Sequence, residues 1–105
     1  MGERVVLCRR GDLASGEVRR FDVGDHRVAL VGIEDDFYAL GDRCSREDYS
    51  LAEGEVWPDE RELECPQHGS TFDLTTGAPC SLPATKPVPV YEIDLEGDDV
   101  AVVLP

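Results

Sequence analysis

The sequence predicts an all-β fold, a sandwich or open barrel of antiparallel strands, and three observations lead to this prediction. Short runs rich in β-branched and aromatic residues recur along the chain, each bounded by turn residues such as Gly, Asp and Pro. No apolar stripe with the 3.6-residue period of a helix persists beyond about two turns. With 105 residues, the chain is long enough for one domain with a modest core.

The first half of the chain contains four expected strands. The clearest is the β-branched run at 27–33, which follows the turn residues Gly24 and Asp25. Short turns connect the runs, which favours a three-strand meander. Segments 13–18 and 50–53 form single helical turns at most. The expected strands are 5–8, 18–23, 27–33 and 37–40.

The second half continues the pattern with shorter strands. A turn at 58–60 separates two three-residue candidates, and 75–77 is read as a hairpin turn. The expected strands are 55–57, 62–64, 71–74, 91–95 and 100–104. We expect a single domain over 1–105, with a small subdomain at about 42–73 and a proline loop at about 81–90.

The charge of the chain excludes several classes of partner. Its 23 acidic residues outnumber 10 Lys and Arg, which gives a formal net charge of −13. This balance argues against binding to nucleic acid or to anionic membrane surfaces. It favours docking on basic protein surfaces, although the acids can equally serve solubility alone.

We expect a cytoplasmic monomer with no membrane attachment. The N-terminus does not have the pattern of a signal peptide, and no apolar stretch approaches the ~20 residues of a membrane span. Four cysteines in such a chain indicate thiols or metal ligands rather than a disulfide framework.

Two cysteine-bearing segments carry the clearest chemical signal. In the run Cys65-Pro66-Gln67-His68-Gly69-Ser70, a thiol and an imidazole stand three residues apart. A second thiol, Cys44, lies in a separate turn-rich segment upstream. Thiolates suit zinc, copper(I) and iron–sulfur clusters, and imidazole suits zinc and iron. Cys44, Cys65 and His68 are therefore candidate ligands of one metal centre.

Three stretches, 44–54, 65–79 and 81–91, resemble the small soluble Rieske-type [2Fe–2S] ferredoxins, which serve oxygenases or accompany iron–sulfur assembly systems. That family carries Cys-x-His in its first ligand box and Cys-x-x-His in its second. The resemblance implies a Rieske-type sandwich with a cluster-binding subdomain. It also implies that two cysteines hold one iron and two histidines hold the other.

The resemblance further implies a function in electron transfer. The chain would carry one electron between a ferredoxin reductase and a terminal oxygenase or another redox enzyme, without being an enzyme itself. Imidazole ligands raise the potential to roughly −150 to +300 mV, against about −400 mV for plant-type ferredoxins. Ser70 would donate a hydrogen bond to a cluster sulfide, and Pro83 would belong to a rigid lid over the cluster. Phe72 stands where high-potential relatives carry a tyrosine hydroxyl, which implies the low to middle part of the range.

One residue departs from the family pattern, because Arg46 occupies the slot of the first histidine ligand. Deprotonating arginine at pH 7 costs about 9 kcal/mol, which makes it a poor iron ligand. Four alternatives stay open. The cluster is absent or unstable; it persists with a substitute ligand such as Asp48, Glu47, hydroxide or an external group; Arg46 itself is a ligand; or Cys44, Cys65 and His68 hold zinc. The competing functions are an electron carrier and a degenerate module that acts through surface contacts.

Overall fold

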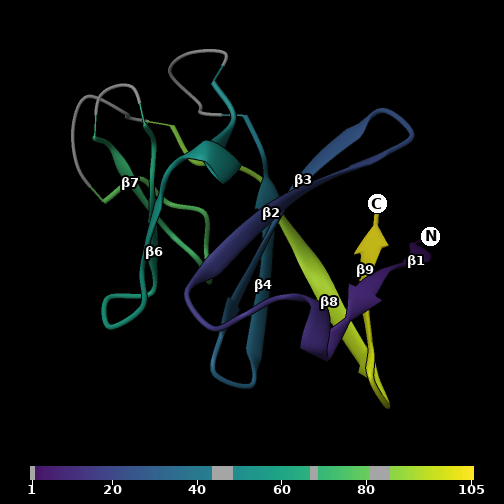
Figure 1. The fold of residues 1–105 in the computed structure, drawn as a ribbon. Coiled ribbons are helices and arrows are strands. Elements are labelled where there is room, and N and C mark those ends of the chain that lie inside the picture. Colours follow the sequence, from purple (N-terminus) through teal and green to yellow (C-terminus); the bar gives the residue numbers. More distant parts are fainter. Residues whose placement is uncertain (1, 44–48, 67–68, 81–85) are drawn as a thin grey trace.

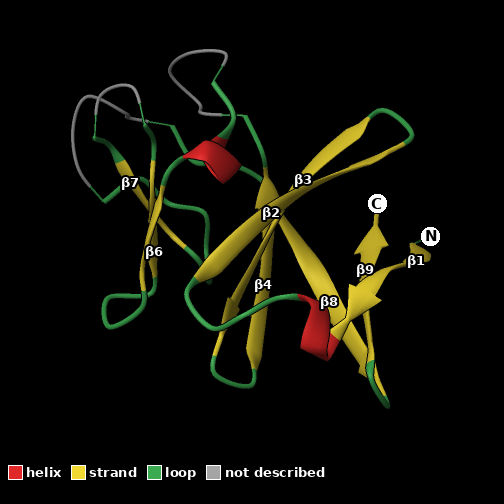
Figure 2. Ribbon diagram, viewed as in Figure 1, coloured by secondary structure: helices red, strands yellow, loops and turns green. Residues whose placement is uncertain are grey.

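The computed structural model describes residues 2–43, 49–66, 69–80 and 86–105, and these residues form two antiparallel sheets (Figure 1). The large sheet has the strand order β1-β9-β8-β4-β3-β2, and the small sheet has the order β5-β6-β7. Figure 2 shows that strands and loops make up nearly all of the described chain, which confirms the all-β prediction. The strands are β1 (Glu3–Arg9), β2 (Glu17–Val23), β3 (His26–Ile33), β4 (Asp36–Gly41), β5 (Glu55–Trp57), β6 (Glu62–Glu64), β7 (Thr71–Asp73), β8 (Val90–Glu96) and β9 (Asp99–Leu104).

The strand bounds agree with the sequence pattern to within one or two residues. Strands β2, β3 and β4 pair in sequence order, so the predicted meander is confirmed. The described residues include two short 3-10 helices, η1 (Arg10–Asp12) and η2 (Leu51–Glu53). The helical turn near 13–18 therefore lies earlier than expected. The Asp12 carboxylate accepts a hydrogen bond from the backbone N–H of Arg9 at 3.0 Å, which favours the turn at that point.

The turn expected at 75–77 is present, but it does not join two full strands. Gly77 donates a backbone hydrogen bond to Asp73 at 2.7 Å, and Phe72 pairs with Pro79 only as an isolated bridge. The returning chain thus stays close to β7 without extending the small sheet.

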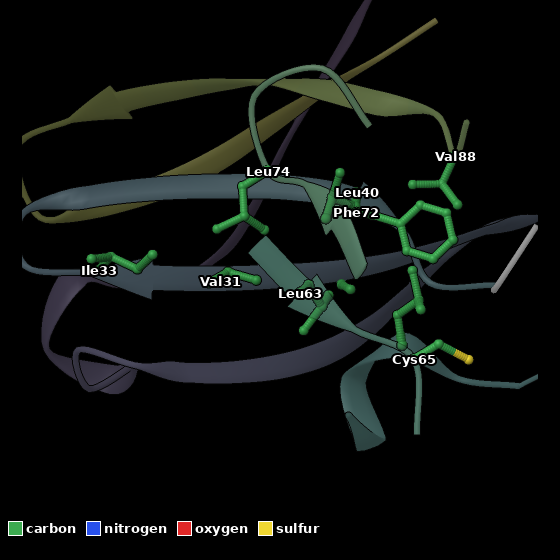
Figure 3. Close-up of a cluster of buried hydrophobic side chains, with 10 residues drawn as sticks. Val31, Ile33, Leu40, Leu63, Cys65, Phe72, Leu74 and Val88 are labelled. Atoms are coloured by element: carbon green, nitrogen blue, oxygen red, sulfur yellow. The ribbon is translucent and has the colours of Figure 1, made fainter. Parts of the chain in front are cut away.

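An apolar core fills the space between the two sheets (Figure 3). Strand β3 is buried over most of its length, since its β-branched residues pack on both faces of the large sheet. Leu63 of β6 and Phe72 of β7 face this strand from the small sheet and are fully buried. The cluster comprises Ala29, Val31, Ile33, Leu40, Leu51, Leu63, Cys65, Phe72, Leu74 and Val88. The core therefore connects the large sheet to the segment that carries a predicted ligand.

Two glycines allow main-chain segments to approach the small sheet closely. A Cβ at Gly54 would overlap the carbonyl oxygen of Glu64, the last residue of β6. A Cβ at Gly77 would overlap the carbonyl oxygen of Val88, and Gly77 also has a φ of +76°, which side chains rarely adopt. Glycine is needed at both positions because a backbone oxygen fills the space of a side chain.

The register of the small sheet brings carboxylates opposite one another. Glu55 of β5 pairs with Glu64 of β6, and Glu62 of β6 pairs with Asp73 of β7. Like charges directly opposite on neighbouring strands are destabilising. The indole N–H of Trp57 donates to the Glu64 carboxylate at 3.2 Å and offsets part of this repulsion.

Among the described residues, no helix is long and apolar enough to span a bilayer.

Replacing Gly54 by alanine tests the close approach to Glu64. We expect Gly54→Ala to lower the free energy of unfolding by about 1–3 kcal/mol, because the new methyl group must displace backbone rather than a flexible side chain. Thermal and urea denaturation measure the change. The matched control is Gly11→Ala, since a Cβ there meets nothing within 4 Å. Equal stability of the two variants would contradict the packing argument.

Candidate metal centre

Cys65 lies directly after β6 at the edge of the core between the sheets. The residue is 1% exposed and packs in the same apolar cluster as Phe72 and Val88 (Figure 3). Its backbone N–H donates to the carbonyl of Ser70 at 2.7 Å, and its carbonyl accepts from the N–H of Gly69 at 3.2 Å. These two bonds close the base of a tight loop that begins at Cys65 and ends at Ser70.

Gly69 and Ser70 complete the described part of this loop. Gly69 has a φ of +72°, a conformation that glycine adopts without strain. Ser70 is 1% exposed and leads directly into β7. Of the predicted site residues, the structure therefore brings Cys65 and Ser70 together, and the hydrogen bond expected from Ser70 to a cluster stays a prediction.

The other predicted site residues lie outside the described part of the chain. They are Cys44, Arg46, His68 and Pro83. Among the described residues, no group of three or more His, Cys, Asp or Glu side chains is placed to share a metal ion. What the structure does show is the base of each segment that carries these residues.

The base of the segment containing Cys44 is fixed by backbone pairing. Arg43 and Ser50 form an antiparallel bridge, and the N–H of Leu51 donates to the carbonyl of Asp42 at 2.7 Å. Leu51 is fully buried in the core cluster that also contains Cys65. This arrangement brings the first ligand segment back to the same core as the second.

The proline segment is also attached to this core, at its C-terminal end. The N–H of Val88 donates to the carbonyl of Gly77 at 2.9 Å, and the N–H of Gly41 donates to the carbonyl of Pro89 at 2.8 Å. Val88 is 4% exposed and packs in the cluster with Phe72. The described ends of all three predicted site segments thus pack on one apolar cluster.

An open hollow of about 500 Å³ lies beside this cluster, at the junction of β2 and the small sheet. Its lining is partly apolar and otherwise acidic, and it includes the residue after Cys65. The lining residues are Gly16, Val18, Glu53, Gly54, Glu55, Val56, Glu64 and Pro66. The charged part of this surface beside the site is negative.

Two further cysteines lie in the described part of the chain. Cys8 is half-buried on β1 and packs in a second apolar cluster of the large sheet. Cys80 is exposed, and its thiol contacts the carbonyl of Ala78 at 3.7 Å. Partial burial raises the pKa of the Cys80 thiol, and the nearby Glu62 carboxylate raises that pKa further. Cys80 is therefore a poorly ionised thiol, which is unlike an activated nucleophile.

Sequence reasoning missed three residues whose contacts lie beside the predicted ligand segments. Asp42, Gly54 and Gly77 each act through contacts to distant parts of the chain. The one sequence feature that could have pointed to Asp42 is its position at the end of an apolar strand, just before the first cysteine box.

Comparison with known proteins gives consistent matches over almost the whole chain. A family model described as the Rieske [2Fe-2S] domain matches residues 3–92. The 3-phenylpropionate/cinnamic acid dioxygenase ferredoxin subunit of Shigella boydii serotype 4 (strain Sb227) is 38% identical over 102 residues, which cover 97% of this chain and 94% of that protein.

Solved structures of ferredoxins superimpose on the fold. The ferredoxin of carbazole 1,9a-dioxygenase from Nocardioides aromaticivorans IC177 matches with a TM-score of 0.92 and 33% identity, over 97% of each chain. A chain from the complex of reduced oxygenase and oxidized ferredoxin in carbazole 1,9a-dioxygenase matches with a TM-score of 0.87 and 36% identity, over 94% of this chain and 91% of that one.

The raised pKa of Cys80 predicts slow alkylation. A thiol reacts as its thiolate, so iodoacetamide should label Cys80 at half-maximal rate only at a pH above that of an ordinary cysteine. Glu62→Gln removes a charge that disfavours the thiolate, so we expect faster labelling at pH 8. Mass spectrometry of the labelled peptide gives the rate, with Glu60→Gln as the control. An unchanged rate in Glu62→Gln would refute the assigned cause.

Proposed function

The chain belongs to the Rieske [2Fe-2S] domain family, and we propose that it is the ferredoxin component of an oxygenase system, passing single electrons from a reductase to the oxygenase. The observation that carries the proposal is the full-length match to ferredoxin subunits, with 38% identity over 97% of the chain. A related ferredoxin occurs in complex with its oxygenase, which supports the same kind of partner here.

The candidate ligands match the family pattern at the iron held by two cysteines. They depart from it at the iron that the family holds with two histidines. Cys44 and Cys65 would supply two thiolates, and His68 would supply one imidazole. A bound cluster of this kind supplies one-electron transfer at a potential set by its ligands and hydrogen bonds. The burial of Cys65 supports its assignment, because an apolar surrounding limits the access of water to a ligand sulfur.

The chain's own residues would tune that potential. Ser70 is buried at the end of the Cys65 loop, and we assign it as a hydrogen-bond donor to a sulfide. Phe72 is fully buried and brings no hydroxyl to the same region. Fewer donors to sulfur stabilise the reduced state less, which supports a potential in the low to middle part of the Rieske range. We propose that Pro83 contributes to a rigid cover over the cluster.

Arg46 leaves the second iron without a conventional fourth ligand. We propose that a carboxylate of the same segment, hydroxide or an external ligand takes this position. The competing function is a degenerate module without a cluster, and the specific observation in its favour is Arg46 itself. Zinc held by Cys44, Cys65 and His68 is the remaining alternative.

The charge distribution supports docking on a basic partner surface. The chain carries a formal net charge of −13, and Glu53, Glu55 and Glu64 line the hollow beside Pro66. Complementary charge speeds encounter between redox partners. We further propose that the protein is a monomer and acts in the cytoplasm.

Metal analysis and the Arg46→His variant test the proposal directly. We expect the purified protein to contain two irons and two acid-labile sulfides per chain, with visible absorption bands. Arg46→His should lengthen the half-life of the cluster, because it restores an imidazole at the second iron.

Any other metal content of the purified protein supports one of the two alternatives. A colourless protein without metal supports the degenerate module, and one zinc per chain supports the structural zinc site. If Arg46→His also binds no cluster, the assignment of Cys44 and Cys65 as ligands is wrong.

A pair of cysteine variants tests the ligand assignment. We expect Cys65→Ser to lose the visible absorption and nearly all of the bound iron, because serine does not supply the thiolate that the cluster requires. Cys80→Ser should retain both, since that thiol is exposed and is not among the predicted ligands. Iron, sulfide and absorption are measured per folded chain. Comparable iron content in the two variants would exclude Cys65 as a ligand.

A further inference from the structure

Asp42 is a buried carboxylate at the point where β4 continues into the first ligand segment. The residue is 1% exposed and stands two positions before Cys44. Burying a carboxylate is strongly unfavourable unless it is paired and hydrogen-bonded, and a buried ion pair is by itself weak evidence for stability. The burial of Asp42 is therefore not explained by a contribution to core stability alone.

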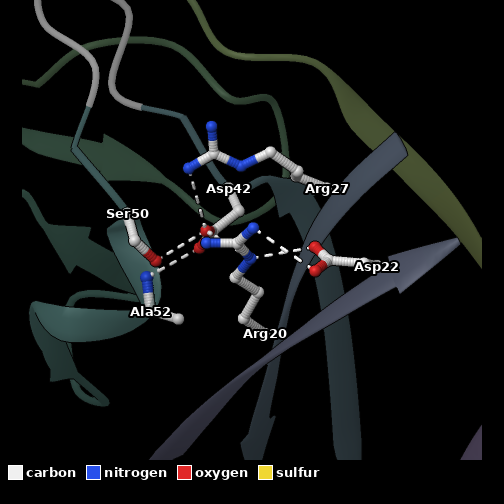
Figure 4. A network of polar contacts seen from close by, with 6 residues as sticks. All are labelled: Arg20, Asp22, Arg27, Asp42, Ser50 and Ala52. Carbon is white, nitrogen blue, oxygen red and sulfur yellow. Dashed lines mark hydrogen bonds and ion pairs between the residues drawn. The ribbon is translucent and has the colours of Figure 1, made fainter. Parts of the chain in front are cut away.

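The carboxylate of Asp42 binds the chain where it returns from the ligand segment (Figure 4). Oδ2 accepts a hydrogen bond from the hydroxyl of Ser50 at 2.5 Å, and Oδ1 accepts one from the N–H of Ala52 at 2.8 Å. The backbone of Asp42 adds two bonds, accepting from the N–H of Leu51 at 2.7 Å and donating to the carbonyl of Arg27 at 2.8 Å. Asp42, which precedes the segment that carries Cys44, is therefore hydrogen-bonded to the residues that follow this segment.

Two arginines of the large sheet, one on β2 and one on β3, lie close to this carboxylate and offset its charge. Nε of Arg20 and Nη2 of Arg27 each lie 3.7 Å from Oδ2 of Asp42. Arg20 also pairs with Asp22, at 2.9 Å between Nε and Oδ1. Figure 4 shows the Arg20 and Arg27 side chains gathered around the Asp42 carboxylate together with Ser50 and Ala52. Asp42 therefore connects β2 and β3 to both ends of the ligand segment.

We propose that Asp42 is a positioning residue for the metal centre, which acts by clamping both ends of the segment that carries Cys44. The proposal rests on the proposed function to the extent that Cys44 is a ligand. A ligand on a loop is held in a defined place only when its supporting contacts are themselves fixed, and the Asp42 contacts provide this at both ends. The carboxylate also adds an electrostatic effect, because its negative charge stands two residues before Cys44 in the chain.

Four variants separate the contributions. Asp42→Asn removes the charge and weakens the hydrogen bonds to the ligand segment. Ser50→Ala removes one bond without changing the charge, and Ser50→Thr restores the hydroxyl. Asp22→Asn is the control, because its carboxylate is 58% exposed, bonds to Arg20 and leaves the contacts of Asp42 to Ser50 and Ala52 intact.

The first measurement is amide hydrogen exchange on the purified full-length protein. We expect Asp42→Asn and Ser50→Ala to exchange about tenfold faster over 43–52 than the wild type, which corresponds to ~1.4 kcal/mol of local opening. Ser50→Thr and Asp22→Asn should remain at the wild-type rate, and peptides of β8 and β9 should be unchanged in all four variants.

The second measurement uses the cluster. In Asp42→Asn and Ser50→Ala we expect a shorter half-life of the visible absorption and altered visible circular dichroism. Only Asp42→Asn should also shift the reduction potential upward, because removing a negative charge two residues from Cys44 favours the more negative reduced state.

Defined outcomes overturn the proposal. If Asp42→Asn lowers the melting temperature but leaves exchange over 43–52, cluster half-life and potential at wild-type values, Asp42 only stabilises the core. If Asp42→Asn does not fold, equal exchange in Ser50→Ala and Ser50→Thr contradicts the clamp. A wild-type protein that holds no cluster overturns the proposed function alone, and the exchange measurements then decide on the clamp.

Discussion

The apolar contact between the two sheets is the constraint on which the candidate metal centre depends. Leu40 of the large sheet packs with Leu63 and Phe72 of the small sheet, and these residues are fully buried. Cys65 and Val88 complete the same cluster, one from a ligand loop and the other from the proline segment. A three-stranded sheet of three-residue strands is too small to hold a rigid loop unaided, so its packing on the large sheet determines where Cys65 lies.

Local signals in the sequence were sufficient for most of the fold. The β-branched run of β3, the turn after Trp57 and the strands expected at 91–95 and 100–104 each depend on neighbouring residues, and the structure confirms them. In the Cys65 loop, Gly69 adopts a positive φ that its residue type permits, and the ligand role of the loop stays a prediction. Strand ends differed by a residue or two because hydrogen bonding to a neighbour extends a strand beyond its apolar pattern.

The contacts that hold the site could not be predicted, because they join residues distant in the chain. Asp42 reads as an ordinary turn residue in the sequence, and its burial depends on Ser50 and on two arginines of other strands. Gly54 likewise reads as a loop glycine, and only the fold brings it against Glu64. Arg46 is the opposite case, because the sequence alone identifies it as a departure and its consequence depends on what binds beside it.

The facing carboxylates of the small sheet make the stability of this sheet depend on the charges that lie close to it. Glu55 opposes Glu64, and Glu62 opposes Asp73, at the short separation of neighbouring strands. At physiological ionic strength the screening length is about 8 Å, so dissolved salt leaves much of this repulsion in place. A cationic group close to these pairs would relieve it, and by linkage whatever binds there stabilises the sheet in proportion to its affinity. The hairpin that ends at Cys65 would therefore be stiffer in a complex with a basic protein than in the free chain.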